Sequence, residues 1–325
     1  MARTRTQTRV QTQTRVRTGT RARTARTART ARTARTARTA LAVALLTAAG
    51  SACQAPGSPP AVSVPRQVVT VRYEDPAPAD QQDAAFLRKR KTAEEAASAL
   101  AGFLDWGDRA PVPLLVKSCA GEGPSYDPEA RRIEICYEEV TETRELFREG
   151  GPRQATADDV RSVLLETLFH ESAHALLDVL GLKLPGNEED LADQFAALML
   201  LREGESGERQ LRTAAEAWRM SAEVYVEDEE TTADEHAPDR ERAVNQLCYV
   251  YGATRAGHRD PAGTGGLPAA RAAGCEREWG AVRTKWTNAL QEALGSRTFG
   301  SQALGSRISG SQALDNPGSN RVGQP

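Results

Sequence analysis

Aromatic residues, methionine and histidine are scarce in this chain of 325 residues, which has 5% aromatics, three methionines and four histidines. Acidic and aromatic side chains are both missing from the first 40 residues, which carry twelve arginines. With those arginines set aside, 30 basic residues face 44 acidic ones, a net charge of −14. Phosphate binding needs a basic face on the folded part of a protein. We therefore expect no nucleic-acid partner.

The sequence has an apolar run at residues 41–50 that is too short to span a bilayer comfortably. It follows a tract in which Ala-Arg-Thr repeats over residues 22–39, and it precedes small residues at 51 and 52. This order is typical of a secretory signal, so we interpret residues 1–52 as a basic leader with a signal and predict an exported protein. The alternative is a low-complexity tail beside a chance apolar patch. The long basic tract leaves open a translation start downstream of Met1.

Cysteine occurs at five positions, an odd number for an exported protein. Cys53 follows the small residues directly, and this resembles a bacterial lipoprotein processing site, where the cysteine is acylated and becomes the mature N-terminus. Gly50 stands where such sites usually have leucine. We predict lipidation of Cys53, and contact with a membrane only through that anchor at the cell surface.

The other four cysteines can pair in three ways. We favour the two local disulfides, Cys119–Cys136 and Cys248–Cys275, which would stabilise the fold in an oxidising compartment. Free buried thiols are the alternative.

Composition divides the rest of the chain into three parts. Six prolines between residues 56 and 78, followed by a charged run at 88–91, favour a linker over residues 53–91 with at most one strand, at Gln67–Tyr73. Residues 296–325 repeat Gly-Ser-Gln-Ala-Leu amid glycine and serine, so we predict a disordered tail. Residues 92–295 remain as one domain, large enough to have its own core.

Within this domain, helical and strand patterns follow one another. Thr92 and Glu95 could form a capping box for a helix over Ala93–Trp106. Val112–Lys117 and Arg132–Tyr137 are predicted to be strands, separated by a turn-rich segment. The pattern is helical from about residue 140 to residue 294.

The clearest helix is predicted over Val160–Leu180. Thr156 and Asp159 have the spacing of a capping box before it, and Gly181 can end it. Leucines and valines recur along it at helical spacing, so one face should contact the core.

His170 and His174 stand four residues apart on that helix, so their side chains project from one face about one turn apart. This spacing allows two imidazole nitrogens to bind one Zn²⁺ at ~2.0–2.1 Å. Glu171 projects beside them, where its carboxylate can take a proton from a water that zinc has made acidic. We predict a zinc site with Glu171 as general base. Two ordinary core or surface histidines are the alternative.

A catalytic zinc site needs a third protein ligand and an open fourth position. No His-x-x-Gly-x-x-His pattern follows, so a metzincin ligand is missing. Residues 187–193 instead begin a helix that is predicted to run to about residue 201, and their Glu-x-x-Ala-Asp resembles the gluzincin arrangement. That resemblance implies Glu189 as third ligand and Asp193 as the carboxylate that orients a histidine.

Two neighbouring acids, Glu188 and Asp190, compete for the ligand role. Only Glu189 precedes Asp193 by four residues, on the same helix face. An ordinary acidic first turn, favoured by the helix dipole, is the alternative for the whole segment.

Further segments extend the resemblance over roughly residues 95–294. They are Tyr126–Pro128, Ile133–Glu138, Phe169–Ala175, Glu189–Phe195, Asp234–Arg242, Cys248–Gly252, Leu267–Cys275 and Trp286. The chain is similar to a bacterial family of zinc metallopeptidases known only as a domain of unknown function. This implies an α+β, zincin-like fold with a small antiparallel sheet, the metal-bearing helix beneath it and a mostly helical C-terminal half.

Two other features suit such a family. His236 resembles the late histidine that stabilises the oxyanion in gluzincins, and Arg242 could share that role; a loop histidine that caps the next helix is the alternative. Arg132–Glu138 could be the edge strand that aligns an extended substrate. A core strand that carries a disulfide is the alternative.

We therefore predict a zinc-dependent peptidase that acts on a peptide or protein substrate. One alternative is a catalytically inactive, lipid-anchored binding protein that keeps zinc for structure. Another is a zinc hydrolase of a non-peptide amide. Glu171 favours an enzyme, because a structural site has no use for a free carboxylate beside zinc.

Overall fold

The computed structural model describes residues 66–225, 236–254 and 267–295. The leader, Cys53 and the tail at 296–325 lie outside these residues, as do residues 53–65 of the expected linker. The described strands are β1 (Val69–Tyr73), β2 (Val112–Lys117), β3 (Ser125–Asp127) and β4 (Arg132–Cys136). The helices are a short 3-10 helix (Pro78–Asp80), α1 (Gln81–Arg90), α2 (Thr92–Phe103), α3 (Glu139–Gly150), α4 (Ala157–Leu180), α5 (Glu188–Leu201), α6 (Glu205–Val224), α7 (Asp239–Ala253) and α8 (Ala269–Leu294).

The four strands form one sheet in the order β1-β2-β4-β3. β1, β2 and β4 run parallel, and only β3 is antiparallel to its neighbour, with Tyr126 opposite Ile133. The α+β class is confirmed, but the sheet is mixed and the antiparallel prediction is wrong for three strands. Parallel neighbours need a long crossover, and helices α1 and α2 provide one between β1 and β2.

The folded region begins before residue 92. β1 and α1 lie within the span expected to be a linker, where β1 pairs with β2 and α1 buries Ala84 and Leu87. Pro76 and Pro78 lie in the short connection between β1 and α1, and Pro78 begins the 3-10 helix. These prolines mark a turn between two packed elements, which composition alone does not distinguish from a linker.

Helix α2 forms without the predicted capping box. Lys91 occupies the N-cap position with a left-handed backbone (φ 56°), and no side chain caps the helix. Thr92 is the first helical residue and is buried. Glu95 instead pairs with Arg161 of α4, so this acid joins two helices rather than completing a cap.

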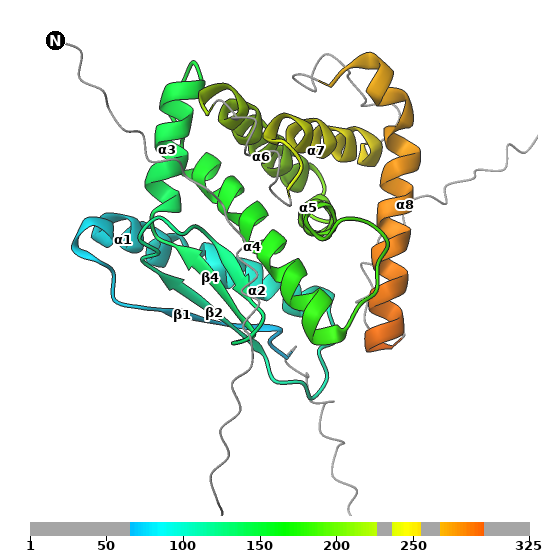
Figure 1. Cartoon of the computed structure of the whole chain (residues 1–325), viewed down its shortest axis with the longest axis horizontal. Helices are drawn as coiled ribbons and strands as arrows, with labels where there is room; N and C mark the ends of the chain where they lie inside the picture. The colour runs from blue at the N-terminus through cyan, green and yellow to red at the C-terminus, as the bar shows by residue number, and fades with distance from the viewer. Residues whose placement is uncertain (1–65, 226–235, 255–266, 296–325) are drawn as a thin grey trace, which may run out of the picture. The chain divides into compact units, whose positions relative to one another are not determined.

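Helix α4 begins at Ala157, three residues before the predicted Val160, and ends at Leu180 as predicted. Thr156 and Asp159 form the capping box, and Gly181 ends the helix with a left-handed backbone (φ 62°). Figure 1 shows α4 running between the sheet on one side and helices α5 and α6 on the other. Every residue from 168 to 177 is therefore buried. A helix buried all round must pair any polar side chain that it carries.

Both predicted disulfides are present. Cys119–Cys136 joins the segment after β2 to the end of β4, with Cα atoms 5.3 Å apart. Cys248–Cys275 joins α7 to α8, with Cα atoms 5.1 Å apart. Near that second bond Gly252 permits a close approach, because a Cβ at this position would lie 2.3 Å from the carbonyl oxygen of Cys275.

Within residues 66–225, 236–254 and 267–295, no helix is both long enough and apolar enough to cross a membrane.

Candidate metal centre

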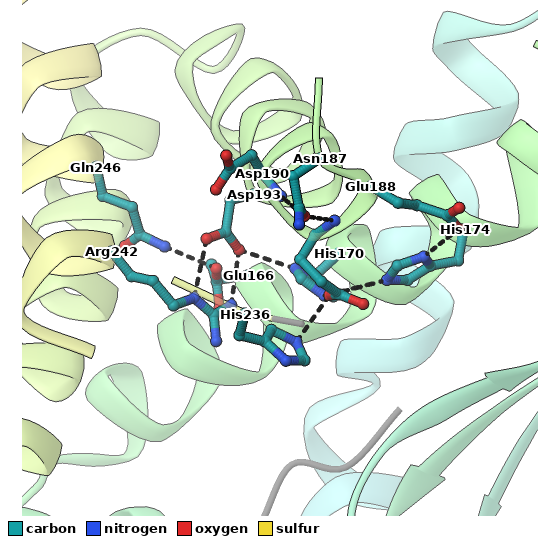
Figure 2. A network of polar contacts seen from close by, with 11 residues as sticks. Glu166, His170, His174, Asn187, Glu188, Asp190, Asp193, His236, Arg242 and Gln246 are labelled. Atoms are coloured by element: carbon teal, nitrogen blue, oxygen red, sulfur yellow. Dashed lines mark hydrogen bonds and ion pairs between the residues drawn. The ribbon is translucent and has the colours of Figure 1, made fainter. Parts of the chain in front are cut away.

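The two motif histidines lie in the fully buried part of α4. His170 and His174 are each 3% exposed, and their ring centroids are 5.0 Å apart. Burying two imidazoles is costly unless both ring nitrogens of each find partners. All four ring nitrogens do so, as Figure 2 shows.

Three potential ligand atoms converge on one point. His170 Nε2 lies 3.3 Å from His174 Nε2 and 3.1 Å from Glu189 Oε2, and His174 Nε2 lies 3.4 Å from the same oxygen. Ligand atoms that bind zinc tetrahedrally at ~2.0–2.1 Å are about 3.3 Å apart. The donor set of two nitrogens and one carboxylate oxygen therefore fits a zinc ion.

Helix α5 places Glu189 opposite the histidines. Its N-cap Asn187 accepts hydrogen bonds from the backbone N–H groups of Glu189 (2.7 Å) and Asp190 (3.3 Å), which fixes the first turn. Glu188 faces the outer nitrogen of His174 instead, with its Oε1 2.9 Å from Nδ1. Of the three competing acids, the structure thus brings Glu189 to the ligand position.

Asp193 lies one turn further along α5, against the outer side of His170. His170 Nδ1 donates to its Oδ1 at 2.9 Å. Arg242 of α7 donates two hydrogen bonds to the same carboxylate, of 2.7 Å to Oδ1 and 2.9 Å to Oδ2. Arg242 is 4% exposed, and its guanidinium lies 3.6 Å from the centre of the Trp218 ring. Arg242 is therefore committed to Asp193, which argues against the oxyanion role that we considered for it.

The charges of the cluster shift its pKa values in the metal-free protein. Burial lowers the pKa of His170, but hydrogen bonds to Asp193 and Glu189 outweigh it and raise this pKa to about 10. Burial is likewise outweighed at His174, where Glu188 and Glu189 raise the pKa to about 9. Burial raises the pKa of Glu189, yet its three histidine partners hold it far below its usual range. The site is thus a set of proton-binding nitrogens around a carboxylate, and a metal ion would replace those protons.

Glu171 is the acid between the two motif histidines. It is fully buried, and neither carboxylate oxygen has a hydrogen-bond partner among the described residues. It lies next to His170 in sequence, about 100° round the helix, so it does not join the three converging atoms. A buried carboxylate without a partner is costly, and a water molecule at the site is the natural group to satisfy it.

His236 comes from the segment before α7 and completes the cluster. Its Nε2 lies 2.7 Å from Glu189 Oε2, and its ring stacks on that of His170 with centroids 5.8 Å apart. Atoms of His170, Glu189 and His236 are close enough to hold one metal ion. The prediction that His236 belongs to the site therefore agrees with its position, which is some 60 residues along the chain from the motif.

Sequence reasoning missed Glu166, a buried acid one turn before His170. Gln246 of α7 donates to its Oε1 at 2.7 Å. Burial, with the charge of Asp193 adding to it, raises the pKa of Glu166 to about 7. A detectable signal was present, because an acid four residues before a ligand histidine shares its helix face.

The prediction that the strand after Arg132 is the edge strand for the substrate is wrong. Residues 132–136 of the predicted segment Arg132–Glu138 form β4, which lies between β2 and β3, so it is not an edge strand. The edge of the sheet next to α4 is β3, and its Tyr126 hydroxyl donates to Asp178 of α4 at 2.7 Å. Asp178 is one turn beyond His174, so this bond holds the edge strand beside the candidate metal ligands.

Comparison with known proteins gives one match. A family described as "Putative metallopeptidase" matches residues 73–290, a span that includes every residue of the cluster. Nothing among curated proteins matches, nor does any solved structure. That description implies a metal-dependent hydrolase of peptides or proteins, which agrees with the convergent side chains. The match covers about two thirds of the chain, and the chain belongs to this family of metallopeptidases.

Proposed function

We propose that this protein is a zinc-dependent peptidase whose metal is held by His170, His174 and Glu189. One observation carries the proposal. The three potential ligand atoms lie 3.1–3.4 Å apart, and a buried carboxylate without a partner, that of Glu171, stands beside them. A structural zinc site has no need for that carboxylate, whereas hydrolysis needs a base.

A zinc ion held by His170, His174 and Glu189 would supply a Lewis acid that lowers the pKa of a bound water molecule and polarises a carbonyl group. Glu171 accepts the proton of that water as it attacks the peptide carbonyl carbon. The same carboxyl group then gives the proton to the nitrogen of the leaving amine, so that the C–N bond breaks and Glu171 is ionised again.

The residues behind the ligands set their orientation. The Asp193 carboxylate accepts the Nδ1–H of His170, which leaves the Nε2 lone pair directed at the metal position. Glu188 has the same relation to Nδ1 of His174. Arg242 holds Asp193 in place by its two hydrogen bonds. Both imidazoles are thereby held in the tautomer that binds metal.

His236 is the group that we propose for the oxyanion. Its Nε2, 2.7 Å from the ligand oxygen of Glu189, lies at the rim of the three converging atoms. From there it can donate to the oxygen that becomes negative in the tetrahedral intermediate. The same closeness favours a second candidate function, in which His236 is a fourth ligand that closes the site and makes the zinc structural.

The test uses zinc content and peptide hydrolysis measured on the same variants. Glu171→Gln keeps the size of the side chain but removes the proton acceptor. We expect it to retain about one zinc per chain and its thermal stability, with hydrolysis reduced at least ~10²-fold. His174→Ala and Glu189→Ala each remove a ligand, so metal affinity and activity should fall together.

A fourth variant, His236→Ala, separates the two candidate functions. If the variant loses activity but keeps its zinc, His236 has the oxyanion role. If it loses both activity and zinc, His236 is the fourth ligand of a closed site. A fully active Glu171→Gln enzyme would contradict the mechanism. If Glu189→Ala binds zinc as tightly as the parent, the third ligand is another residue, with Glu188, Asp193 and His236 next to test.

A further inference from the structure

We propose that a cavity beside His174 is the specificity pocket of the enzyme and takes an apolar side chain, leucine or larger, from the substrate residue next to the cleaved bond. This inference rests on the peptidase function proposed above. The cavity has a volume of about 710 Å³. Six apolar residues line it: Pro128, Leu177, Leu182, Leu184, Pro185 and Leu191.

The position of the cavity connects it to the metal centre. His174 lines it, so a group that fills the cavity lies next to a proposed zinc ligand. Tyr126 of β3 lines it as well. β3 is an edge of the sheet, and an extended peptide can pair with such an edge. Alternate side chains of the peptide would then point towards α4, and one of them would enter this cavity.

The two acids that line the cavity, Asp178 and Glu188, are already engaged. Asp178 accepts from the Tyr126 hydroxyl and lies 3.5 Å from Nε of Arg131. Glu188 bonds to His174 Nδ1 at 2.9 Å. Lys183 lies on the exposed connection between α4 and α5. A basic substrate side chain would thus lose water to an apolar wall without gaining a free acid, and an acidic one would meet only the exposed, solvated Lys183.

The size of the cavity sets a lower limit on the side chain. Ligand pockets usually measure roughly 300–1,000 Å³, so this one has room for a bulky side chain and part of its backbone. An alanine side chain would leave most of the leucines in contact with water. One methylene group in a hydrophobic pocket changes kcat/KM by about 10-fold or more. We therefore expect leucine and phenylalanine substrates to exceed the alanine substrate by at least that factor.

The experiment compares the zinc-loaded parent with Leu184→Lys and Leu201→Lys. Leu201 is the matched control: it is also partly buried against the core, but it lies at the far end of α5, about 20 Å along the helix from Glu188. The substrates are peptides with leucine, phenylalanine, alanine, aspartate or lysine next to the cleaved bond. Leu184→Lys should lower kcat/KM for leucine and phenylalanine at least ~10-fold and favour aspartate, while Leu201→Lys keeps the parent preference.

Further measurements distinguish a change in specificity from a loss of folding or of catalysis. Thermal unfolding shows whether Leu184→Lys folds, and Leu184→Ala, which enlarges the cavity, should shift the preference towards phenylalanine. Binding of the same peptides to Glu171→Gln, which should not cleave them, reports on the pocket without hydrolysis. The expected affinity order is phenylalanine and leucine above alanine, with charged residues last.

The outcomes distinguish the two proposals. If the parent cleaves all five peptides equally, or if Leu184→Lys slows all of them by one factor, the pocket inference is wrong and the peptidase function stands. If the parent binds zinc but cleaves no peptide, the peptidase function is wrong. In that case the peptide affinities of Glu171→Gln decide whether the cavity takes apolar side chains. If adding Leu184→Lys to Glu171→Gln leaves the order of these affinities unchanged, the pocket inference is wrong.

Discussion

At Asp193 one carboxylate serves two partners on different helices. It accepts from His170 on α4 and from Arg242 on α7, and it is itself on α5. Burial raises the pKa of Asp193, but the Arg242 charge and the His170 contact outweigh it and hold this pKa far below its usual range. Asp193 therefore stays ionised, which a hydrogen-bond acceptor for a ligand histidine must be.

Replacing Arg242 tests this arrangement at the scale of one residue. Lysine keeps the positive charge but cannot hold both carboxylate oxygens, so Arg242→Lys should leave Asp193 less well oriented. We expect zinc affinity to fall about 10–100-fold, measured by competition with a chelator. Arg271→Lys is the control, because Arg271 also holds both oxygens of a carboxylate, that of Glu278, away from the site. Unchanged zinc affinity in Arg242→Lys would contradict a positioning role.

At the scale of elements, the contact between α7 and α8 depends on one glycine. A methyl group at Gly252 would lie 2.3 Å from the carbonyl oxygen of Cys275, so Gly252→Ala must push the helices apart. We expect a loss of about 1–3 kcal/mol of unfolding free energy in a denaturant titration. Gly274→Ala on α8 is the control, since nothing lies within 4 Å of its added Cβ. It should be neutral or stabilising by up to ~1 kcal/mol, because alanine favours helix over glycine.

The capping box of α4 should make the free energy of unfolding depend on pH. Burial raises the pKa of Asp159, but hydrogen bonds from Arg153 and Thr156 outweigh it and hold this pKa below its usual value. A carboxyl group with a lowered pKa stabilises the fold above its unfolded pKa of about 3.9. That stabilisation disappears as pH falls through the folded pKa.

We therefore expect Asp159→Asn to cost about 1 kcal/mol of unfolding free energy at pH 7. The difference from the parent should shrink as the pH falls below about 4. Asp158→Asn, in the same helical turn with an 83% exposed side chain, should cost less at pH 7. A parent and an Asp159→Asn variant with parallel stability curves down to pH 2 would show that the cap carries no such charge effect.

At the scale of the whole molecule, the leader and Cys53 lie outside the described residues, and export stays a prediction. We propose that the mature chain begins at an acylated Cys53 and that its metallopeptidase domain is held at a membrane surface. Intact-mass measurement of the chain purified from the producing cell should show cleavage before Cys53 and added lipid, with partition into detergent. Cys53→Ser should abolish both. An unmodified Cys53 would exclude the lipid anchor but would leave secretion possible.

The organisation of the folded part was only partly predictable. The motif helix, its two ends and both disulfides could be predicted from local patterns, because capping and helical spacing depend on neighbours in sequence. The strand expected at Gln67–Tyr73 is present as β1, but helix α1 was not predicted, because prolines near Pro78 look alike in a linker and in a tight turn. Nor could the sheet order be predicted, since the pairing of β2 with β4 across the intervening β3 depends on long-range packing.

For the metal centre, the sequence by itself determined the two histidines, the carboxylate between them and the helix that carries all three. These are properties of a few consecutive residues and of helix geometry. Tertiary structure decided which acid of α5 faces the histidines, that His236 approaches Glu189 and that Arg242 holds Asp193. Those contacts join residues that lie 19 to 49 positions apart in the sequence, and no local pattern specifies how such segments pack. The cavity beside His174 has the same origin, because its walls come from β3, α4, α5 and the connection between the last two.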